Sequence, residues 1–208
     1  MKKVFIVGGG APYARMFEAN GFCTTTVIAD ADILCFTGGE DVSPVLYGEP
    51  NVASGANIGR DLREMEAYNY GKQWKLPMVG ICRGGQFLNV MSGGSMYQDV
   101  NNHGIGGTHA AYNLLDGNVY QVTSTHHQMM RKGIKGEVLV MAELSTRRVY
   151  GEYDENCMPR AVEERGQFTD DTECIIYRDT KTLCFQPHPE YHAPSCTELF
   201  FKLLTEIL

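Results

Sequence analysis

The chain carries the stretch PMVGICRGGQFLNVM at residues 77–91, in which an apolar run passes through a cysteine between glycines into a second apolar segment. This order is typical of a strand, a sharp turn and a helix, with the cysteine at the tip of the turn. Gly80 and Gly84 stand two residues before and after Cys82, and the absence of a Cβ atom at these positions lets the chain turn tightly. The sequence therefore predicts a nucleophile elbow centred on Cys82.

The second apolar segment, which begins at Gln86, is predicted to be a helix that points its N-terminus at Cys82. The dipole and the free backbone N–H groups at such an end favour a thiolate over a thiol, and they can later bind an oxyanion. We therefore expect a cysteine hydrolase or an acyl-transfer enzyme.

The length and composition are those of one ordinary globular domain spanning residues 1–208. Of the 208 residues, 43% are hydrophobic and 21% are charged, which allows a sizeable core. The net charge of −7, without a cluster of Lys and Arg, argues against nucleic acid or an anionic membrane as a partner, because phosphate contacts need concentrated positive charge. We therefore expect a small-molecule substrate, with no nucleic-acid partner and no membrane partner.

Two features favour a cytoplasmic protein. The apolar run Val4–Val7 is too short for the core of a signal peptide and is better interpreted as a first strand. The seven cysteines form no C-x-x-C pair and no regular Cys/His metal pattern, so all except Cys82 are interpreted as ordinary core or surface residues in a reducing compartment. The sequence thus predicts a cytoplasmic protein with no metal and no cofactor.

Apolar runs of strand length alternate with helical segments in the first half of the chain, whereas the second half resembles short strands separated by turns. The pattern predicts an α/β fold: a mostly parallel sheet flanked by helices, with a small antiparallel extension in the second half. The expected strands are Val4–Val7, Thr25–Ile28, Ile33–Phe36, Met78–Ile81, Tyr120–Thr123, Val138–Met141, Ala161–Glu163, Cys174–Tyr177 and Thr182–Phe185. The expected helices, besides the one after Cys82, are Tyr13–Asn20, Asp61–Trp74 and Glu198–Leu208.

A candidate base and an acid that could orient it follow the last expected strand, in the stretch QPHPE at residues 186–190. His188 can take the proton of the Cys82 thiol and later give it to the leaving group. Glu190 can fix the imidazole tautomer and stabilise its cationic form. Because Pro189 restricts the chain between them, a loop can turn both side chains toward one site. We therefore predict that Cys82, His188 and Glu190 are catalytic.

Two further segments offer polar groups to a substrate. The stretch TGGEDV at residues 37–42 places two glycines at the end of an expected strand, where backbone N–H groups can face a carbonyl. The N–H groups of Gly39 and Arg83 would form an oxyanion hole, in which one donor lowers the barrier by about 3–4 kcal/mol. The stretch STHHQ at residues 124–128 places two histidines in a loop that can recognise a charged small molecule.

Together, these motifs resemble class I glutamine amidotransferases, and most closely their gamma-glutamyl hydrolase branch, which includes enzymes that cleave gamma-glutamyl-gamma-aminobutyrate. The matching motifs follow the order of the family over most of the chain. They are GGEDVSP (38–44), GICRGGQ (80–86), GGSMYQD (93–99), STHHQ (124–128) and HPE (188–190).

The resemblance implies a flavodoxin-like α/β fold with Cys82 as nucleophile, His188 as base and Glu190 as the acid that orients the base. It further implies that Gln86 and His127 lie beside the bound glutamyl group. The substrate would be a small gamma-glutamyl compound or glutamine.

Two other patterns are given structural interpretations. The run Gly8–Gly10 lacks the rest of a dinucleotide fingerprint, so we expect a plain turn from strand to helix. His103 and His109 have no carboxylate or cysteine at ligand-like spacing, so we expect a flexible glycine-rich loop near the mouth of the site rather than a metal site.

The leading hypothesis is a cysteine hydrolase that cleaves a gamma-glutamyl amide bond through a gamma-glutamyl thioester and releases glutamate and an amine. The alternative is a glutaminase subunit that delivers ammonia from glutamine to a synthase on a separate chain. A third hypothesis is a non-catalytic binding protein that has kept the fold, against which the intact Cys82, His188 and Glu190 argue. The sequence leaves open the identity of the amine and whether the chain forms a homo-oligomer.

Overall fold

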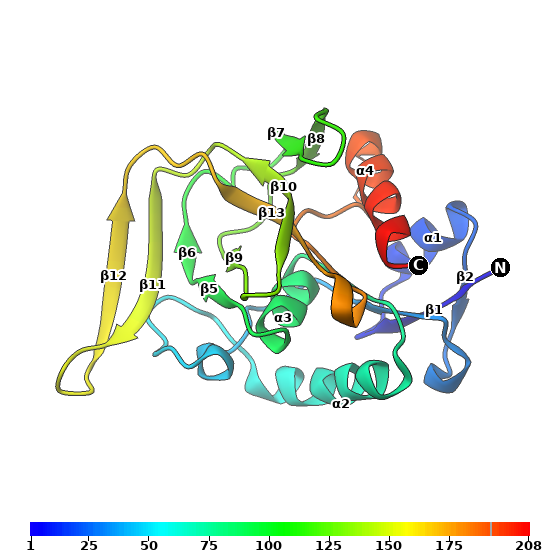
Figure 1. Cartoon of the computed structure of the whole chain (residues 1–208), viewed down its shortest axis with the longest axis horizontal. Helices are drawn as coiled ribbons and strands as arrows, with labels where there is room; N and C mark the ends of the chain where they lie inside the picture. The colour runs from blue at the N-terminus through cyan, green and yellow to red at the C-terminus, as the bar shows by residue number, and fades with distance from the viewer. Residues whose placement is uncertain (192) are drawn as a thin grey trace.

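The structure is a computed structural model that describes residues 1–191 and 193–208. Its centre is a nine-stranded sheet in the order β2-β1-β3-β4-β14-β13-β10-β7-β8 (Figure 1). The first five strands run parallel, and they are β2 (Cys23–Thr25), β1 (Lys3–Val7), β3 (Ile33–Phe36), β4 (Met78–Ile81) and β14 (Thr182–Phe185). The last four continue the sheet antiparallel, and they are β13 (Asp171–Tyr177), β10 (Glu137–Ala142), β7 (Thr108–Asn113) and β8 (Val119–Thr123).

Helices cover both faces of this sheet (Figure 1). Because side chains alternate along a strand, Ile33 and Cys35 pack on one face and Leu34 and Phe36 on the other, and all four are buried. The first face is covered by α1 (Ala11–Ala19) and α4 (Pro194–Leu204), and the second by α2 (Ile58–Trp74) and α3 (Arg83–Met91). Short 3-10 helices occur at Ile28–Asp30, Pro44–Tyr47, Arg178–Thr180 and Thr205–Ile207.

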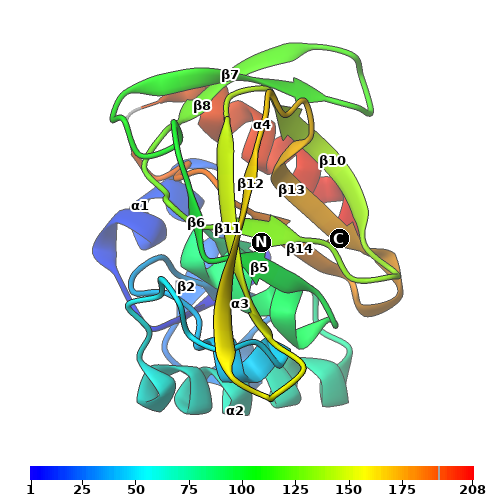
Figure 2. The same cartoon turned by 90° about the vertical axis from the view of Figure 1, so that its left-hand side faces the viewer.

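Two smaller sheets lie beside the main one. The first has the order β12-β11-β6 and contains β12 (Pro159–Arg165), β11 (Arg147–Tyr153) and β6 (Asp99–Val100). The second pairs β5 (Ser95–Tyr97) with β9 (Met129–Arg131). Figure 2 shows the β11–β12 hairpin as a long ribbon across the front of the molecule. None of the helices in the described residues is long and apolar enough to cross a membrane.

The α/β fold with a largely parallel sheet and an antiparallel extension is confirmed, with corrections to individual elements. The expected strand Thr25–Ile28 is wrong, because β2 ends at Thr25 and a 3-10 helix begins at Ile28. The last helix begins at Pro194 instead of Glu198, since proline is well suited to the first helical turn. The extension gains β7, which was not foreseen, whereas the expected strand Ala161–Glu163 belongs to β12 of the separate three-stranded sheet, where it pairs with the unforeseen β11.

Candidate active site

The sharp turn expected at Cys82 is present between β4 and α3. Cys82 adopts φ 52° and ψ −114°, a conformation that non-glycine residues rarely occupy, and its N–H donates to the Phe185 carbonyl at 2.8 Å. A Cβ atom at Gly80 would overlap the Gly84 carbonyl, and one at Gly84 would overlap the Phe36 carbonyl. The two glycines therefore allow three segments of backbone to approach closely around Cys82.

The side chain of His188 lies in the same site, directly after β14. Its Nδ1 is 2.6 Å from Glu190 Oε1, and its backbone N–H donates to Thr123 Oγ1 at 2.6 Å. The imidazole stacks on the Tyr191 ring, with 4.5 Å between the ring centroids and 4° between the planes. These contacts fix the ring, and the carboxylate on Nδ1 leaves Nε2 as the nitrogen available for proton transfer.

Cys82 and Glu190 also determine the charge of this imidazole. Burial acts to lower the pKa of His188, but the contacts with Cys82 and Glu190 outweigh burial and raise the pKa to about 10. The site therefore favours an imidazolium that faces the sulfur, and this imidazolium can later donate a proton.

Tyr13 is a residue of the candidate site that the sequence did not reveal. Its hydroxyl accepts the N–H of Gly38 at 3.1 Å. Burial and the nearby Glu190 carboxylate raise the pKa of Tyr13, so the ring stays a neutral phenol beside the carboxylate. Tyr13 belongs to α1 and is distant in sequence from every motif, so no local pattern could have indicated it.

Arg60 sets the orientation of the Gly38–Gly39 peptide, which contains one of the expected oxyanion donors. Arg60 Nη2 donates to the carbonyls of Thr37 at 3.1 Å and of Gly38 at 2.8 Å. The C=O and the following N–H of a trans peptide point in opposite directions, so the N–H of Gly39 points away from Arg60. Gly39 has φ 142°, and a Cβ atom there would overlap Arg60 Nη1.

The side chain of Arg83 is buried and forms ion pairs with Asp61 and Glu64 of α2. Burial lowers the pKa of Arg83 to about 10, and the neighbouring Arg60 acts in the same direction. The ion pairs with α2 keep the guanidinium away from a substrate. The group of Arg83 that can donate to a substrate oxyanion is therefore its backbone N–H, at the first position of α3.

The two expected substrate-binding residues lie in different surroundings. Gln86 Nε2 donates to Gln186 Oε1 at 3.2 Å, and Gln186 Nε2 lies 3.8 Å from Cys82 Sγ, so Gln86 is linked to the sulfur. The His127 side chain is 54% exposed. Its Nε2 is 3.1 Å from Asp41, and hydrogen bonding to that carboxylate raises the pKa of His127.

The interpretation of the segment around His103 and His109 as a flexible loop at the mouth of the site is wrong. His103 is fully buried, and His109 is a buried residue of β7. Both imidazoles contact Glu173 of β13, at 3.1 Å and 3.0 Å. The carboxylate that the sequence spacing did not reveal is thus supplied by a distant strand, because β10 brings β7 and β13 into one sheet.

A cavity of about 940 Å³ lies beside the segment that contains Gly38. Tyr13, Gly38 and Arg60 line it, whereas Cys82 and His188 are not among the described residues that do. We therefore do not place the reacting bond in this cavity.

Comparison with known proteins identifies relatives that match part of the chain. The family model for Peptidase C26 matches residues 3–129. The protein PB2B2.05 of Schizosaccharomyces pombe, whose name assigns it to the glutamine amidotransferases, is 31% identical over 147 residues, which cover 61% of this chain and 57% of that protein. The gamma-glutamyl-gamma-aminobutyrate hydrolase PuuD of Escherichia coli is 41% identical over 60 residues, which cover 29% of this chain and 24% of PuuD. The matched parts thus span about half the length of the first relative and a quarter of the second.

The fold is also found in solved structures. A glutamine amidotransferase from Thermotoga maritima superposes with a TM-score of 0.62 at 12% identity, covering 99% of this chain and 84% of that chain. Likeness at this level of identity establishes the shared fold.

Proposed function

The chain belongs to the Peptidase C26 family, and from this premise we propose that it hydrolyses a gamma-glutamyl amide bond through a thioester on Cys82. The observation that carries the proposal is the pairing of His188 with Glu190 at 2.6 Å beside a cysteine in a strained elbow conformation. The identity with PuuD over 60 residues supports a gamma-glutamyl substrate.

In the first step, the Cys82 thiolate attacks the side-chain carbonyl carbon of a glutamyl group, and the carbonyl oxygen becomes an oxyanion. The N–H groups of Gly39 and Arg83 donate to this oxyanion, each stabilising it by about 3 kcal/mol. The peptide orientation that Arg60 imposes on Gly39 supports this role, since it directs the N–H away from the arginine.

In the second step, His188 Nε2 gives its proton to the departing amine as the carbon–nitrogen bond breaks, which leaves a gamma-glutamyl thioester. His188 then takes a proton from water, and the hydroxide attacks the thioester and releases glutamate. Glu190 holds the ring through Nδ1 and stabilises its cation at each stage. These steps need no cofactor.

Gln86 and His127 are proposed to bind the glutamyl group. The link from Gln86 through Gln186 to the sulfur supports a position near the reacting carbon. For His127, the support is its exposure on the loop at residues 124–128 and its raised pKa beside Asp41, which favour a cation that could pair with a substrate carboxylate.

The alternative is a glutaminase that transfers ammonia to a synthase on another chain. The resemblance of the S. pombe protein and of the Thermotoga maritima structure to this chain favours it, since both are named as glutamine amidotransferases. Both functions use the same thioester, so they differ in substrate and partner rather than in the first chemical step.

The test is glutamate release from a panel of gamma-glutamyl amides and from glutamine by the purified chain. Steady hydrolysis of a gamma-glutamyl amide without any added protein supports the hydrolase. Glutamine cleavage that appears only with an added synthase supports the alternative. Cys82→Ala must abolish release, whereas Cys23→Ala, at an exposed cysteine, must retain it. A Cys82→Ala protein that still releases glutamate rules out both functions.

A further inference from the structure

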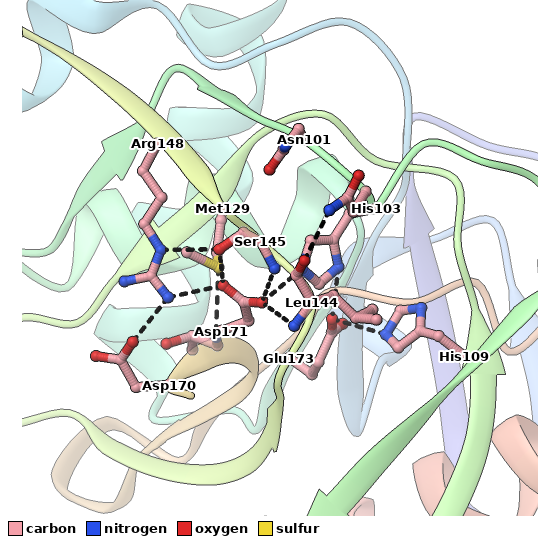
Figure 3. A network of polar contacts seen from close by, with 12 residues as sticks. Asn101, His103, His109, Met129, Leu144, Ser145, Arg148, Asp170, Asp171 and Glu173 are labelled. Carbon is pink, nitrogen blue, oxygen red and sulfur yellow. Dashed lines mark hydrogen bonds and ion pairs between the residues drawn. The ribbon is translucent and has the colours of Figure 1, made fainter. Parts of the chain in front are cut away.

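A buried histidine cluster, made of His103, His109, His126 and Glu173, lies where β7 and β13 meet two loops, and Figure 3 shows His103, His109 and Glu173 of this cluster. The side chains of these four residues are 0%, 3%, 2% and 0% exposed. Neither the proposed hydrolysis nor the hydrophobic core explains why three imidazoles and a carboxylate are buried together.

Three imidazole nitrogens converge on one carboxylate oxygen of this cluster. Glu173 Oε1 is 3.1 Å from His103 Nδ1, 3.0 Å from His109 Nε2 and 3.6 Å from His126 Nε2. Ligand atoms bound tetrahedrally at zinc distances lie about 3.4 Å from one another. One ligand atom from each of His103, His109 and Glu173 lies within 4.8 Å of the other two, close to the separations that a single ion requires, whereas His126 lies just outside this group.

The nitrogen of His103 that faces away from Glu173 is held as it is in metal sites. His103 Nε2 lies 3.1 Å from Asp171 Oδ2, and Figure 3 shows this ring between Asp171 and Glu173. Asp171 is fixed in turn by the backbone N–H groups of Leu144 at 2.8 Å and Ser145 at 2.7 Å. A carboxylate on the far nitrogen orients a metal-binding histidine and increases its basicity.

His126 lies against the same carboxylate. Its Nδ1 is 2.8 Å from the Gln128 carbonyl. Its Nε2 faces Glu173 Oε1 at 3.6 Å and has no hydrogen-bond partner among residues 1–191 and 193–208. A buried carboxylate with three imidazole rings around it is stabilised when a cation lies between them.

We propose that this cluster binds one divalent transition-metal ion, with zinc as the best fit. The ligands are His103 Nδ1, His109 Nε2 and Glu173 Oε1, and His126 Nε2, which is 3.6 Å from Glu173 Oε1, would move closer to the ion as the fourth. Imidazole nitrogens with one carboxylate oxygen suit zinc, and a buried set of four protein ligands leaves no open position for substrate. The site is therefore structural rather than catalytic.

The bound ion would stabilise the backbone that supports the candidate active site. The Gln128 carbonyl that holds His126 also lies 3.5 Å from Gln86 Nε2. The Glu173 carbonyl accepts the N–H of Gln186 at 2.8 Å, just before the loop that carries His188. The ion would thus join the β13 side of the sheet to both sides of the elbow.

The test is the metal content of the chain produced in medium supplemented with Zn²⁺ and dialysed against a weak chelator. The chain carries Cys23→Ser and Cys157→Ser, because these exposed cysteines could hold adventitious metal. We expect about one zinc ion per chain, measured by inductively coupled plasma mass spectrometry. Protein produced with Co²⁺ should show the intense visible absorption of a four-coordinate ion, without bands from thiolate ligation.

Two variants make the assignment specific. His109→Asn should lower the metal content several-fold, while His127→Asn, at an exposed neighbouring histidine, should leave it unchanged. Cys82→Ala should also keep the metal, so this result does not depend on the proposed hydrolysis. A folded wild-type chain with far less than one ion after growth in either metal would overturn the proposal and would mean that the cluster holds protons only.

Discussion

Each residue of the candidate active site is positioned by contacts that leave one reactive atom free. Cys82 takes a strained backbone conformation, His188 is held through Nδ1 and its backbone N–H, and Arg83 has its side chain tied to α2. The sulfur, the Nε2 atom of His188 and the N–H at the start of α3 are what remain for a substrate. Restricted groups of this kind lower the barrier because little reorganisation is needed during the reaction.

Replacing the acid that orients His188 should slow the reaction while leaving the fold intact. Glu190→Gln removes the charge that stabilises the imidazolium, so we expect kcat to fall by about 10²–10⁴-fold. The measurement is glutamate release under saturating substrate. Glu155→Gln, at an exposed position, is the matched control and should keep full activity. Equal rates for the two variants would show that Glu190 does not orient the base.

The raised pKa of His188 also makes folding stability depend on pH. The folded pKa of about 10 lies above the unfolded value of about 6.5, so protonated His188 contributes its full stability below pH 6.5 and loses it as the pH rises through 10. Between pH 6.5 and 9, the free energy of unfolding should fall by about 1–3 kcal/mol more in the wild type than in His188→Gln. Denaturant titrations at the two pH values measure this, and parallel losses in both proteins would contradict it.

At the scale of elements, the β4–α3 elbow is the feature that the sequence revealed best. Its glycines stand at fixed distances from Cys82, and close approach of the backbone is a local requirement that local spacing can express. Tyr13 and Glu173 were not foreseen as parts of sites, because the order of the strands brings them into place. Glu173 lies 64 positions after its contact His109, and the glycines before His109 suggested a loop.

The bounds of short elements were also hard to predict. The stretch Thr25–Ile28 is apolar enough for a strand, yet it lies at the edge of the sheet, where β2 pairs with β1 through only three residues. The hairpin β11–β12 carries many charged residues, and β12 is largely exposed to solvent, which masks the alternation expected of a strand. Pairing with neighbouring strands, rather than local sequence preference, determines the bounds of β2 and of the β11–β12 hairpin.

A methyl group added at the elbow should destabilise this element. In Gly84→Ala, the new Cβ atom would overlap the Phe36 carbonyl, so β3 or α3 must shift. We expect the free energy of unfolding to fall by about 1–3 kcal/mol and activity to fall with it. Gly166→Ala, where a Cβ atom meets nothing within 4 Å, should change stability little. Equal stability of the two variants in denaturant titrations would show that the elbow tolerates the methyl group.

At the scale of the whole molecule, we propose that residues 1–208 fold as one domain. Phe200 of α4 packs against Phe17 of α1 at 5.9 Å and Phe185 of β14 at 5.4 Å, measured between ring centroids. On the opposite face of the sheet, α2 carries Trp74, the only tryptophan of the chain. A single domain requires that both faces unfold together.

Removing the Phe200 ring should therefore lower the stability of the elements on both faces of the sheet. We expect Phe200→Ala to lower the free energy of unfolding by about 3–5 kcal/mol. The loss should appear equally in Trp74 fluorescence and in circular dichroism, whereas Leu62→Ala, at an exposed position of α2, should change stability by about 0.5 kcal/mol or less. Separate transitions for the two signals would show that the faces belong to different folding units.

The central claim is that the Cys82 sulfur becomes covalently bonded to a glutamyl group during turnover. The most direct measurement is rapid acid quenching of the chain during hydrolysis of a gamma-glutamyl amide, followed by mass spectrometry of its peptides. The account predicts that the peptide containing Cys82 gains the mass of one glutamyl residue, and that hydroxylamine removes it as expected for a thioester. Continued turnover with only unmodified Cys82, together with glutamate release by Cys82→Ala, would contradict it.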